Sequence, residues 1–164
     1  MKMSMESTVN ISTQTAAMLT GKSVRTINNW LENGTITGSR VQVDRGPGGL
    51  MWQIGLFGIA AHIPIDLTAD SITEIARADA GDADGINNVG TCFYRSKEYK
   101  IAVGWFEAAA KKGHADAMEL LSMCYVNGLG VEKNQVLGVQ WLGKAAALGH
   151  SVAKAKLQAL GFEV

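Results

Sequence analysis

This sequence has few cysteines, no excess of basic or acidic residues and no long apolar segment. Only two of the 164 residues are cysteine, which excludes a disulfide-rich scaffold and predicts buried thiols in a reducing compartment. Fifteen basic residues balance fifteen acidic ones, so no overall charge draws the chain to nucleic acid or to a membrane surface. The apolar stretch 50–65 is too short to span a bilayer and is interrupted by Gln53, His62 and Pro64. Since no apolar signal segment follows Lys2, we expect a cytoplasmic protein.

Catalytic and metal-binding patterns are also lacking. A zinc site needs four ligands at local spacings, but His62, His114 and His150 are scattered and no such spacing appears. The glycine-rich stretch 46–49 is no phosphate loop, because no Gly-Lys-Ser/Thr follows it. We therefore predict no catalytic residue, no cofactor and no metal. For the same reason we expect that the protein is not an enzyme. The apolar fraction of 47% indicates a globular rather than a disordered chain.

What the sequence does contain is a repeat. Glycines with similar surroundings lie 32 and then 36 residues apart, at Gly81, Gly113 and Gly149. Trp105 and Trp141 are also equivalent, 36 residues apart. A period of this length is typical of stacked helix-turn-helix units.

Each unit is predicted to contain two helices, here called A and B. In the second unit they span about 115–127 and 136–148, and each has apolar or small residues at spacings of three and four. Small side chains such as Gly138 and Ala145 let the two backbones approach, and Gly113 and Gly149 suit left-handed helix caps. The third unit is expected to be a single helix, 152–160, and 71–80 to be a degenerate helix B with Asp70 as its N-cap.

The repeat resembles the Sel1-like repeat, a relative of the tetratricopeptide repeat. The resemblance rests on Leu121-Ser122, Tyr125, the loop 127–131, Trp141-Leu142, Ala145-Ala146 and Gly149. The first unit departs from the pattern, because its turn at 95–98 is four residues shorter and lacks the Gly-Leu-Gly-Val sequence. The resemblance implies an α-solenoid that binds other proteins.

By analogy with tetratricopeptide stacking, one face of the A helices forms a groove that binds a protein or peptide. Its predicted residues, here called the A-helix face, are Asp84, Asn87, Thr91, Tyr94, Asp116, Glu119, Met123 and Val126. An acidic surface with an aromatic residue and a methionine suits a basic or amphipathic peptide. The alternative is that these positions are simply exposed to solvent.

The first 65 residues follow a different pattern. After a tail at 1–10, a helix capped by Ser12 or Thr13 and a second helix from Ser23 to about Asn33 flank a turn at 20–22. Alternating residues at 40–45 and 50–54 predict a β-hairpin, and 56–63 reads as a short helix. Trp30 and Trp52 lie on apolar faces and are expected in the core.

This order resembles the winged helix-turn-helix of the MerR and excisionase families. The resemblance rests on residues 15–27, on Trp30, Gly34 and Ile36, and on the hairpin ending at 52–54. It implies that the second helix enters the major groove of double-stranded DNA. The residues that it would place toward DNA are Lys22, Ser23, Arg25, Thr26, Asn28, Asn29, Arg40 and Arg45.

Other features weigh against DNA binding. Residues 12–54 hold four basic side chains against Glu32 and Asp44, and so few phosphate contacts give weak, salt-sensitive binding. The long dimerisation helix of MerR proteins is replaced by the repeats, so DNA binding would need a homodimer formed in another way, or a partner. Two hypotheses stay open: a bacterial-type DNA-binding regulator whose repeats recruit a protein, and an adaptor whose helix-turn-helix does not bind DNA.

The expected fold is therefore mainly α. A small winged helix-turn-helix domain with one β-hairpin, 11–65, precedes a short α-solenoid of Sel1-like helix pairs, 66–164.

Overall fold

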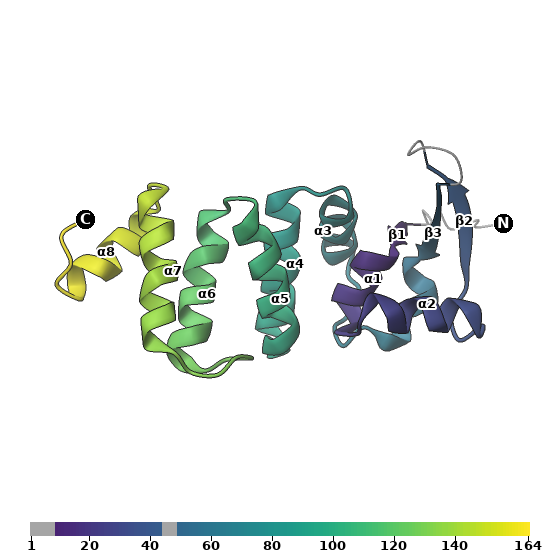
Figure 1. Ribbon diagram of the computed structural model, residues 1–164, viewed down its shortest axis with the longest axis horizontal. Coiled ribbons are helices and arrows are strands. Elements are labelled where there is room, and N and C mark those ends of the chain that lie inside the picture. Colours follow the sequence, from purple (N-terminus) through teal and green to yellow (C-terminus); the bar gives the residue numbers. More distant parts are fainter. Residues whose placement is uncertain (1–8, 44–48) are drawn as a thin grey trace. The chain divides into compact units, whose positions relative to one another are not determined.

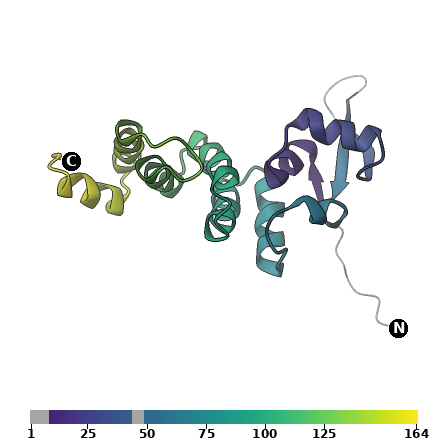
Figure 2. The ribbon, with the colours of Figure 1, turned by 90° about the horizontal axis from the view of Figure 1, so that it is seen from below.

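The computed structural model describes residues 9–43 and 49–164. The chain forms two compact units, residues 1–72 and 73–164, and Figures 1 and 2 show their elements from two directions. The sequence analysis placed a boundary at 65/66, whereas the two units meet inside one helix, α3 (Ala69–Asp79). The tail expected at 1–10 falls almost entirely outside the described residues.

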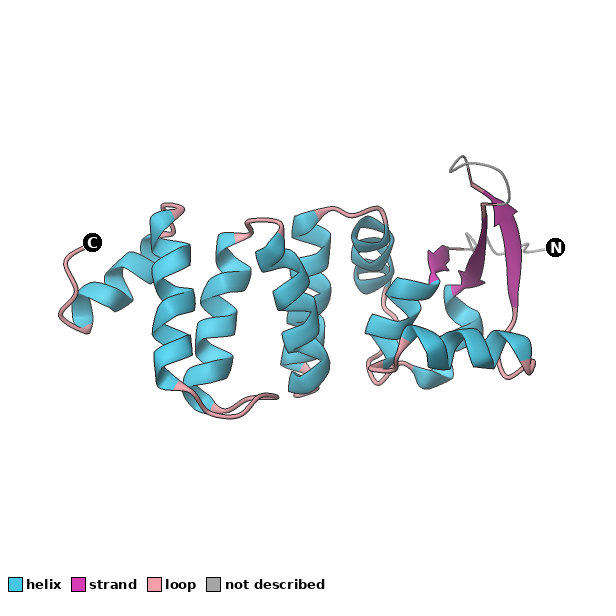
Figure 3. Cartoon of the chain, in the orientation of Figure 1, coloured by secondary structure: helices cyan, strands magenta, loops and turns pink. Residues whose placement is uncertain are grey.

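The first unit contains every strand of the described residues, as Figure 3 shows. Its elements are β1 (Asn10–Ser12), α1 (Thr13–Thr20), α2 (Val24–Glu32), β2 (Gly38–Gln42), β3 (Leu50–Gly55) and the 3-10 helix η1 (Leu56–His62). The sheet is antiparallel with the order β1-β3-β2. The predicted hairpin and both predicted helices are present.

The strand β1 was not predicted. We expected structure to begin near Ile11 with a helix capped by Ser12 or Thr13, but Ile11 itself pairs with Ile54 of β3 and both side chains are buried. A three-residue strand is too short to display the alternation by which strands are identified. Ser12, which follows directly, caps α1 by accepting a hydrogen bond from the Thr15 amide at 3.2 Å.

The prediction that Trp30 and Trp52 belong to the core is wrong, because both are half-buried. Burial along one face of β3 decreases from Ile54, which is fully buried, to Trp52 and then to Leu50, which is 54% exposed. The hairpin thus extends beyond the core of the unit. In α2, Ile27 is fully buried, whereas the Trp30 ring lies against the ring of His62, with centroids 4.5 Å apart.

The N-terminal cap of α3 also differs from the prediction. Thr68, not Asp70, holds the helix start, because the Thr68 hydroxyl accepts the Ser71 amide at 3.2 Å while the Ser71 hydroxyl accepts the Thr68 amide at 2.8 Å. This reciprocal pair satisfies two backbone donors at once. Asp70 lies within the first turn of α3, where a carboxylate suits the positive end of the helix dipole.

The second unit consists of helices, and the four longest of them run alternately in opposite directions (Figure 1). The helices of this unit are the end of α3, α4 (Ala83–Arg95), α5 (Tyr99–Lys111), α6 (Ala115–Asn127), α7 (Gln135–Ala147) and α8 (Ser151–Ala159). The predicted helices of the repeat match these within about two residues. Gly113 and Gly149 have φ values of 84° and 89°, which confirms the predicted left-handed caps.

Each A helix packs closely on its B helix, as the small residues predict. A Cβ atom at Gly90 of α4 would lie 2.8 Å from the Phe106 ring of α5. A Cβ atom at Gly138 of α7 would lie 2.6 Å from the Val126 side chain of α6. Because glycine brings the backbones together, Phe93, Trp105 and other large side chains can fill the remaining space and are almost fully buried.

Candidate functional site

Two histidines begin the second and third A helices. His114 is the N-cap of α6 and His150 is the N-cap of α8. In each, the ring Nδ1 atom accepts a backbone N–H, from Ala117 at 3.2 Å and from Ala153 at 3.1 Å. An imidazole nitrogen that accepts carries no proton, so the proton lies on Nε2 and the ring is neutral.

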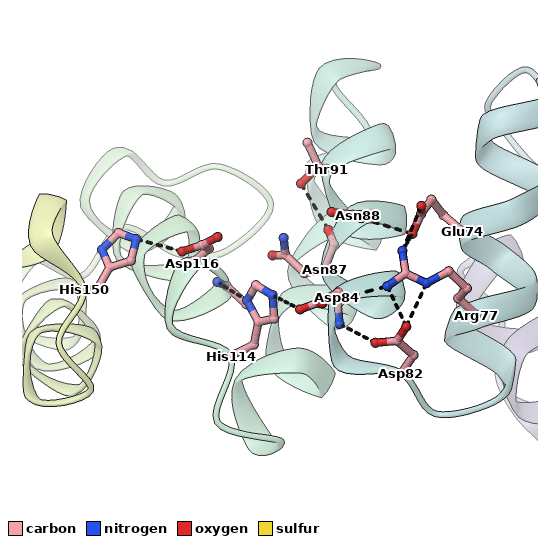
Figure 4. A network of polar contacts seen from close by, with 11 residues as sticks. Glu74, Arg77, Asp82, Asp84, Asn87, Asn88, Thr91, His114, Asp116 and His150 are labelled. Carbon is pink, nitrogen blue, oxygen red and sulfur yellow. Dashed lines mark hydrogen bonds and ion pairs between the residues drawn. The ribbon is translucent and has the colours of Figure 1, made fainter.

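The same rings bridge successive repeats (Figure 4). Nε2 of His114 lies 3.1 Å from Asp84 Oδ1, and Nε2 of His150 lies 2.8 Å from Asp116 Oδ1. Each Nε2–H can therefore donate a hydrogen bond to the carboxylate of its aspartate. The two aspartates are also open to solvent, with side chains 70% and 64% exposed. We call these two contacts the His–Asp rungs.

The sequence argued against both histidines as zinc ligands, but it did not predict that they bridge successive repeats. A repeated spacing could have revealed these contacts, because an aspartate follows the N-cap residue by two positions in two of the repeats. The pairs are Asp82 with Asp84 and His114 with Asp116. The third unit has Val152 at that position.

At the start of the array, Asp82 is the N-cap in place of a histidine, and an arginine binds it. Arg77 of α3 donates from Nε to Asp82 Oδ2 at 2.7 Å and bonds Glu74 at 3.0 Å, and it approaches Asp84 at 3.8 Å. The hydrogen bond from Arg77 lowers the pKa of the Asp82 carboxyl, and the same bond raises the pKa of Arg77. Glu74 also accepts a hydrogen bond from Asn88 at 3.0 Å, which ties α3 to α4.

The next row of the A-helix face is buried. Asn87 is only 7% exposed, and its Oδ1 atom has no hydrogen-bond partner among the described residues. The equivalent Glu119 is 9% exposed and pairs with Lys156 of α8. Because Lys156 of α8 covers Glu119, this residue is not simply exposed to solvent, which was the alternative to a place in the groove.

Further along the helices the face becomes apolar. Tyr94 is half-buried against Tyr99 and Phe106, with ring centroids 5.2 and 6.2 Å away, and this burial raises its pKa. Thr91 is half-buried and donates to the Asn87 carbonyl oxygen at 3.1 Å. Eight residues of α6, α7 and α8 line a cavity of about 340 Å³: Ser122, Met123, Val126, Asn127, Leu142, Lys156, Ala159 and Leu160.

The residues expected at DNA lie on α2, on the turn before it and on the hairpin. Lys22, Ser23, Arg25, Asn29 and Arg40 are exposed, Thr26 and Asn28 are half-buried, and Arg45 lies outside the described residues. Three of the side chains have partners within the unit, and the hydroxyls of Ser23 and Thr26 share a hydrogen bond at 2.9 Å. The Ser23 hydroxyl caps α2 by accepting the Thr26 amide at 3.1 Å, and the Arg40 guanidinium lies 4.7 Å from the centre of the Trp52 ring.

Among the described residues, no group of three or more His, Cys, Asp or Glu side chains is arranged to hold a metal ion. Among the helices of those residues, none has the length and apolar character needed to cross a membrane. Cys92 and Cys124 are both thiols. Cys124 is fully buried, and burial raises the pKa of its thiol to about 11.

Comparison with known proteins identifies the helix pairs. The Sel1 repeat matches twice, at residues 83–114 and 115–150, and the match does not extend to residues 1–82. The comparison with curated proteins gave no match. A crystallised Sel1 repeat protein from Oxalobacter formigenes is 26% identical over 57% of this chain, with a TM-score of 0.47, and the alignment spans 45% of that protein's chain. Residues 83–150 of this chain are Sel1 repeats, a class of repeat that generally binds other proteins.

Proposed function

We propose that the second unit is a protein-interaction module whose A-helix face receives a segment of another protein. The observation that carries the proposal is the pair of Sel1 repeats, 83–150, with a cavity of about 340 Å³ at the A-helix face of the second repeat. Asp84 and Asp116 leave charge exposed at one end of that face. A cavity beside exposed charge offers both affinity and orientation to a bound segment.

Site-specific photo-crosslinking of the full chain in cell extract tests this proposal. A photo-reactive residue replaces Asn127, which is exposed and lines the cavity. The matched control replaces Gly104 of α5, where an added Cβ meets nothing within 4 Å. The proposal predicts a discrete protein adduct at position 127 and none at position 104. Equal labelling at the two positions, or labelling at 104 alone, would contradict it.

A second candidate function concerns the first unit. We propose that α2 contacts double-stranded DNA, because α1, its turn and α2 stand beside a three-stranded sheet in the order typical of a winged helix-turn-helix. The exposed Arg25 and Asn29 carry the donors that base edges and phosphates accept. DNA binding of this kind would serve the regulation of transcription. The alternative is an adaptor protein whose first unit does not bind DNA.

Binding to a random fluorescent duplex at low and raised salt separates these alternatives. The DNA proposal predicts binding that weakens steeply with salt and that Arg25→Ala weakens further. Lys154→Ala, which removes an exposed charge from α8, is the matched control and should have little effect. The absence of binding at low salt, or equal effects of the two variants, would support the adaptor.

A further inference from the structure

One edge of the sheet in the first unit is open. β2 is the outer strand in the order β1-β3-β2, and among the described residues no strand lies beyond it (Figure 1). Every residue of β2 is exposed except Val41, which is half-buried. The outer edge of β2 is therefore accessible to a segment of another protein.

The register of the hairpin identifies the backbone groups on that edge. Opposite residues of an antiparallel pair alternate between those that exchange both hydrogen bonds and those that exchange none. The Val43 amide donates to the Gly49 carbonyl oxygen at 2.7 Å, which marks a pair of the first kind. At steps of two along the register, Val41 and Ser39 bond to β3 in the same way. The N–H and C=O groups of the alternate residues point away from β3, and these residues are Gly38, Arg40 and Gln42.

β2 lacks most of the features that keep a sheet edge from accepting another strand. Prolines, bulges and charged side chains are the usual ones. β2 contains no proline, and its register with β3 is continuous over all five of its residues. Its one charged residue is Arg40, which is exposed. An added strand can therefore pair along the whole of β2, and the single charge decides which strand is favoured.

That charge disfavours a second copy of the chain and favours an acidic partner. If two copies paired antiparallel along the whole of β2, Arg40 would lie directly opposite its own copy, and like charges in that position are destabilising. An acidic side chain at the same place would instead accept hydrogen bonds from the guanidinium. The guanidinium lies 4.7 Å from the centre of the Trp52 ring, which holds it near the sheet.

The other face of the sheet offers apolar contact beside the same edge. Val41 lies opposite Met51 of β3, and Met51 is 42% exposed. In an added antiparallel strand, the residue just before the one opposite Arg40 lies opposite Val41, and the two neighbours point to opposite faces. An apolar residue at that position would cover Val41 and extend the apolar contact that Val41 makes with Met51.

We propose that β2 accepts an extended segment of another protein as a further strand, antiparallel to β2. The segment has an acidic residue opposite Arg40 and, directly before it, an apolar residue opposite Val41. Its backbone exchanges hydrogen bonds with Gly38, Arg40 and Gln42. This surface goes beyond the functions proposed above, because it uses neither the A-helix face nor α2.

Synthetic peptides titrated into the ¹⁵N-labelled full chain and followed by NMR provide the test. The probe is a capped seven-residue peptide of serine and threonine with valine at its third position and glutamate at its fourth. Its binding should shift the amide signals of Gly38, Arg40 and Gln42. N-methylation of the glutamate, whose N–H points toward β2, should weaken binding roughly tenfold. N-methylation of the next residue, whose N–H points to solvent, is the matched control and should have little effect.

Variants of the protein locate the effect. Changing the glutamate of the peptide to lysine should weaken binding to the unchanged protein roughly fivefold, and Arg40→Glu should reverse this preference. Gln42→Pro removes an N–H that points away from β3, a change that an edge strand tolerates, and should weaken the glutamate peptide roughly tenfold. Gln42→Ala keeps this N–H and should bind like the unchanged protein.

Binding by no peptide, equal binding of the two N-methylated peptides, or an unchanged preference in Arg40→Glu would overturn the proposal. Concentration-dependent association of the unchanged chain that Gln42→Pro abolishes would also overturn it, because the edge would then bind a second copy. None of these results bears on the functions proposed above, which are measured by crosslinking at position 127 and by duplex binding.

Discussion

Gly130 offers a sharp test of how the repeats hold together. It lies in the loop between α6 and α7, with φ at 73°. A Cβ atom there would lie 2.4–2.6 Å from backbone atoms of Tyr99 and Lys100, at the start of α5. The loop of the second Sel1 repeat is thus packed directly on the backbone of the first. Gly130→Ala would separate the two.

Two contributions add to the expected effect. An L-residue in the left-handed region is destabilised by about 1–2 kcal/mol. The clash adds about 1–3 kcal/mol, a range typical of overpacking, since backbone rather than a flexible side chain must move. Gly130→Ala should therefore lower the free energy of unfolding by roughly 2–5 kcal/mol. Gly149→Ala is the matched control: its φ of 89° is similarly strained, but nothing lies within 4 Å of an added Cβ, so only about 1–2 kcal/mol is expected.

Urea unfolding of the full chain, followed by circular dichroism at 222 nm, measures both variants. The difference between them isolates the contact of the loop with Tyr99. If Gly130→Ala loses no more stability than Gly149→Ala, the loop does not pack on the first repeat and the reasoning is refuted.

Three further predictions concern single residues. Lys97 has a φ of 63°, which costs any L-residue about 1–2 kcal/mol relative to glycine. Urea unfolding should therefore show a higher free energy of unfolding for Lys97→Gly and a lower one for Lys97→Val, whose branched side chain is disfavoured further at positive φ. Burial in the folded chain raises the pKa of the Cys124 thiol from 9.0 to about 11. The free energy of unfolding should therefore be unaffected by this thiol below pH 9 and should decrease by roughly 2–3 kcal/mol between pH 9 and 11, because the thiol ionises first in the unfolded chain. Cys124→Ala should remove this decrease. The hydrogen bond from Arg77 lowers the pKa of Asp82, so the contribution of Asp82 to the free energy of unfolding is present above the ordinary value of 3.8 and is lost on acidification below it. In thermal unfolding from pH 6 to 2, the unfolding temperature of Arg77→Ala should therefore decrease less than that of the unchanged protein.

The helices of the second unit could be predicted because local and repeated signals agree. Gly113 and Gly149 mark helix ends, and Trp105 and Trp141 recur at the same place in each B helix. A repeat presents the same pattern more than once, so its period identifies the helices even where one copy is irregular. The turn of the first unit, which ends in a left-handed Lys97, is such an irregular copy.

The features that escaped prediction depend on contacts between distant residues. Asp84 and His114 are 30 residues apart and meet only because successive A helices lie side by side. Glu119 is buried by Lys156 of α8, 37 residues later. The strand β1 is identified by its pairing with β3 rather than by its own three residues. Sequence patterns report the faces of single helices, and they do not show which faces a later helix covers.

Hydrogen exchange of the full chain, with and without the protein recovered by crosslinking, tests whether that protein binds at the A-helix face. Binding there predicts that amides of α4 and α6 exchange more slowly in the complex, and that those on the outer turns of α5 and α7 do not change. Slower exchange in α5 and α7 with no change in α4 and α6 would contradict binding at the A-helix face.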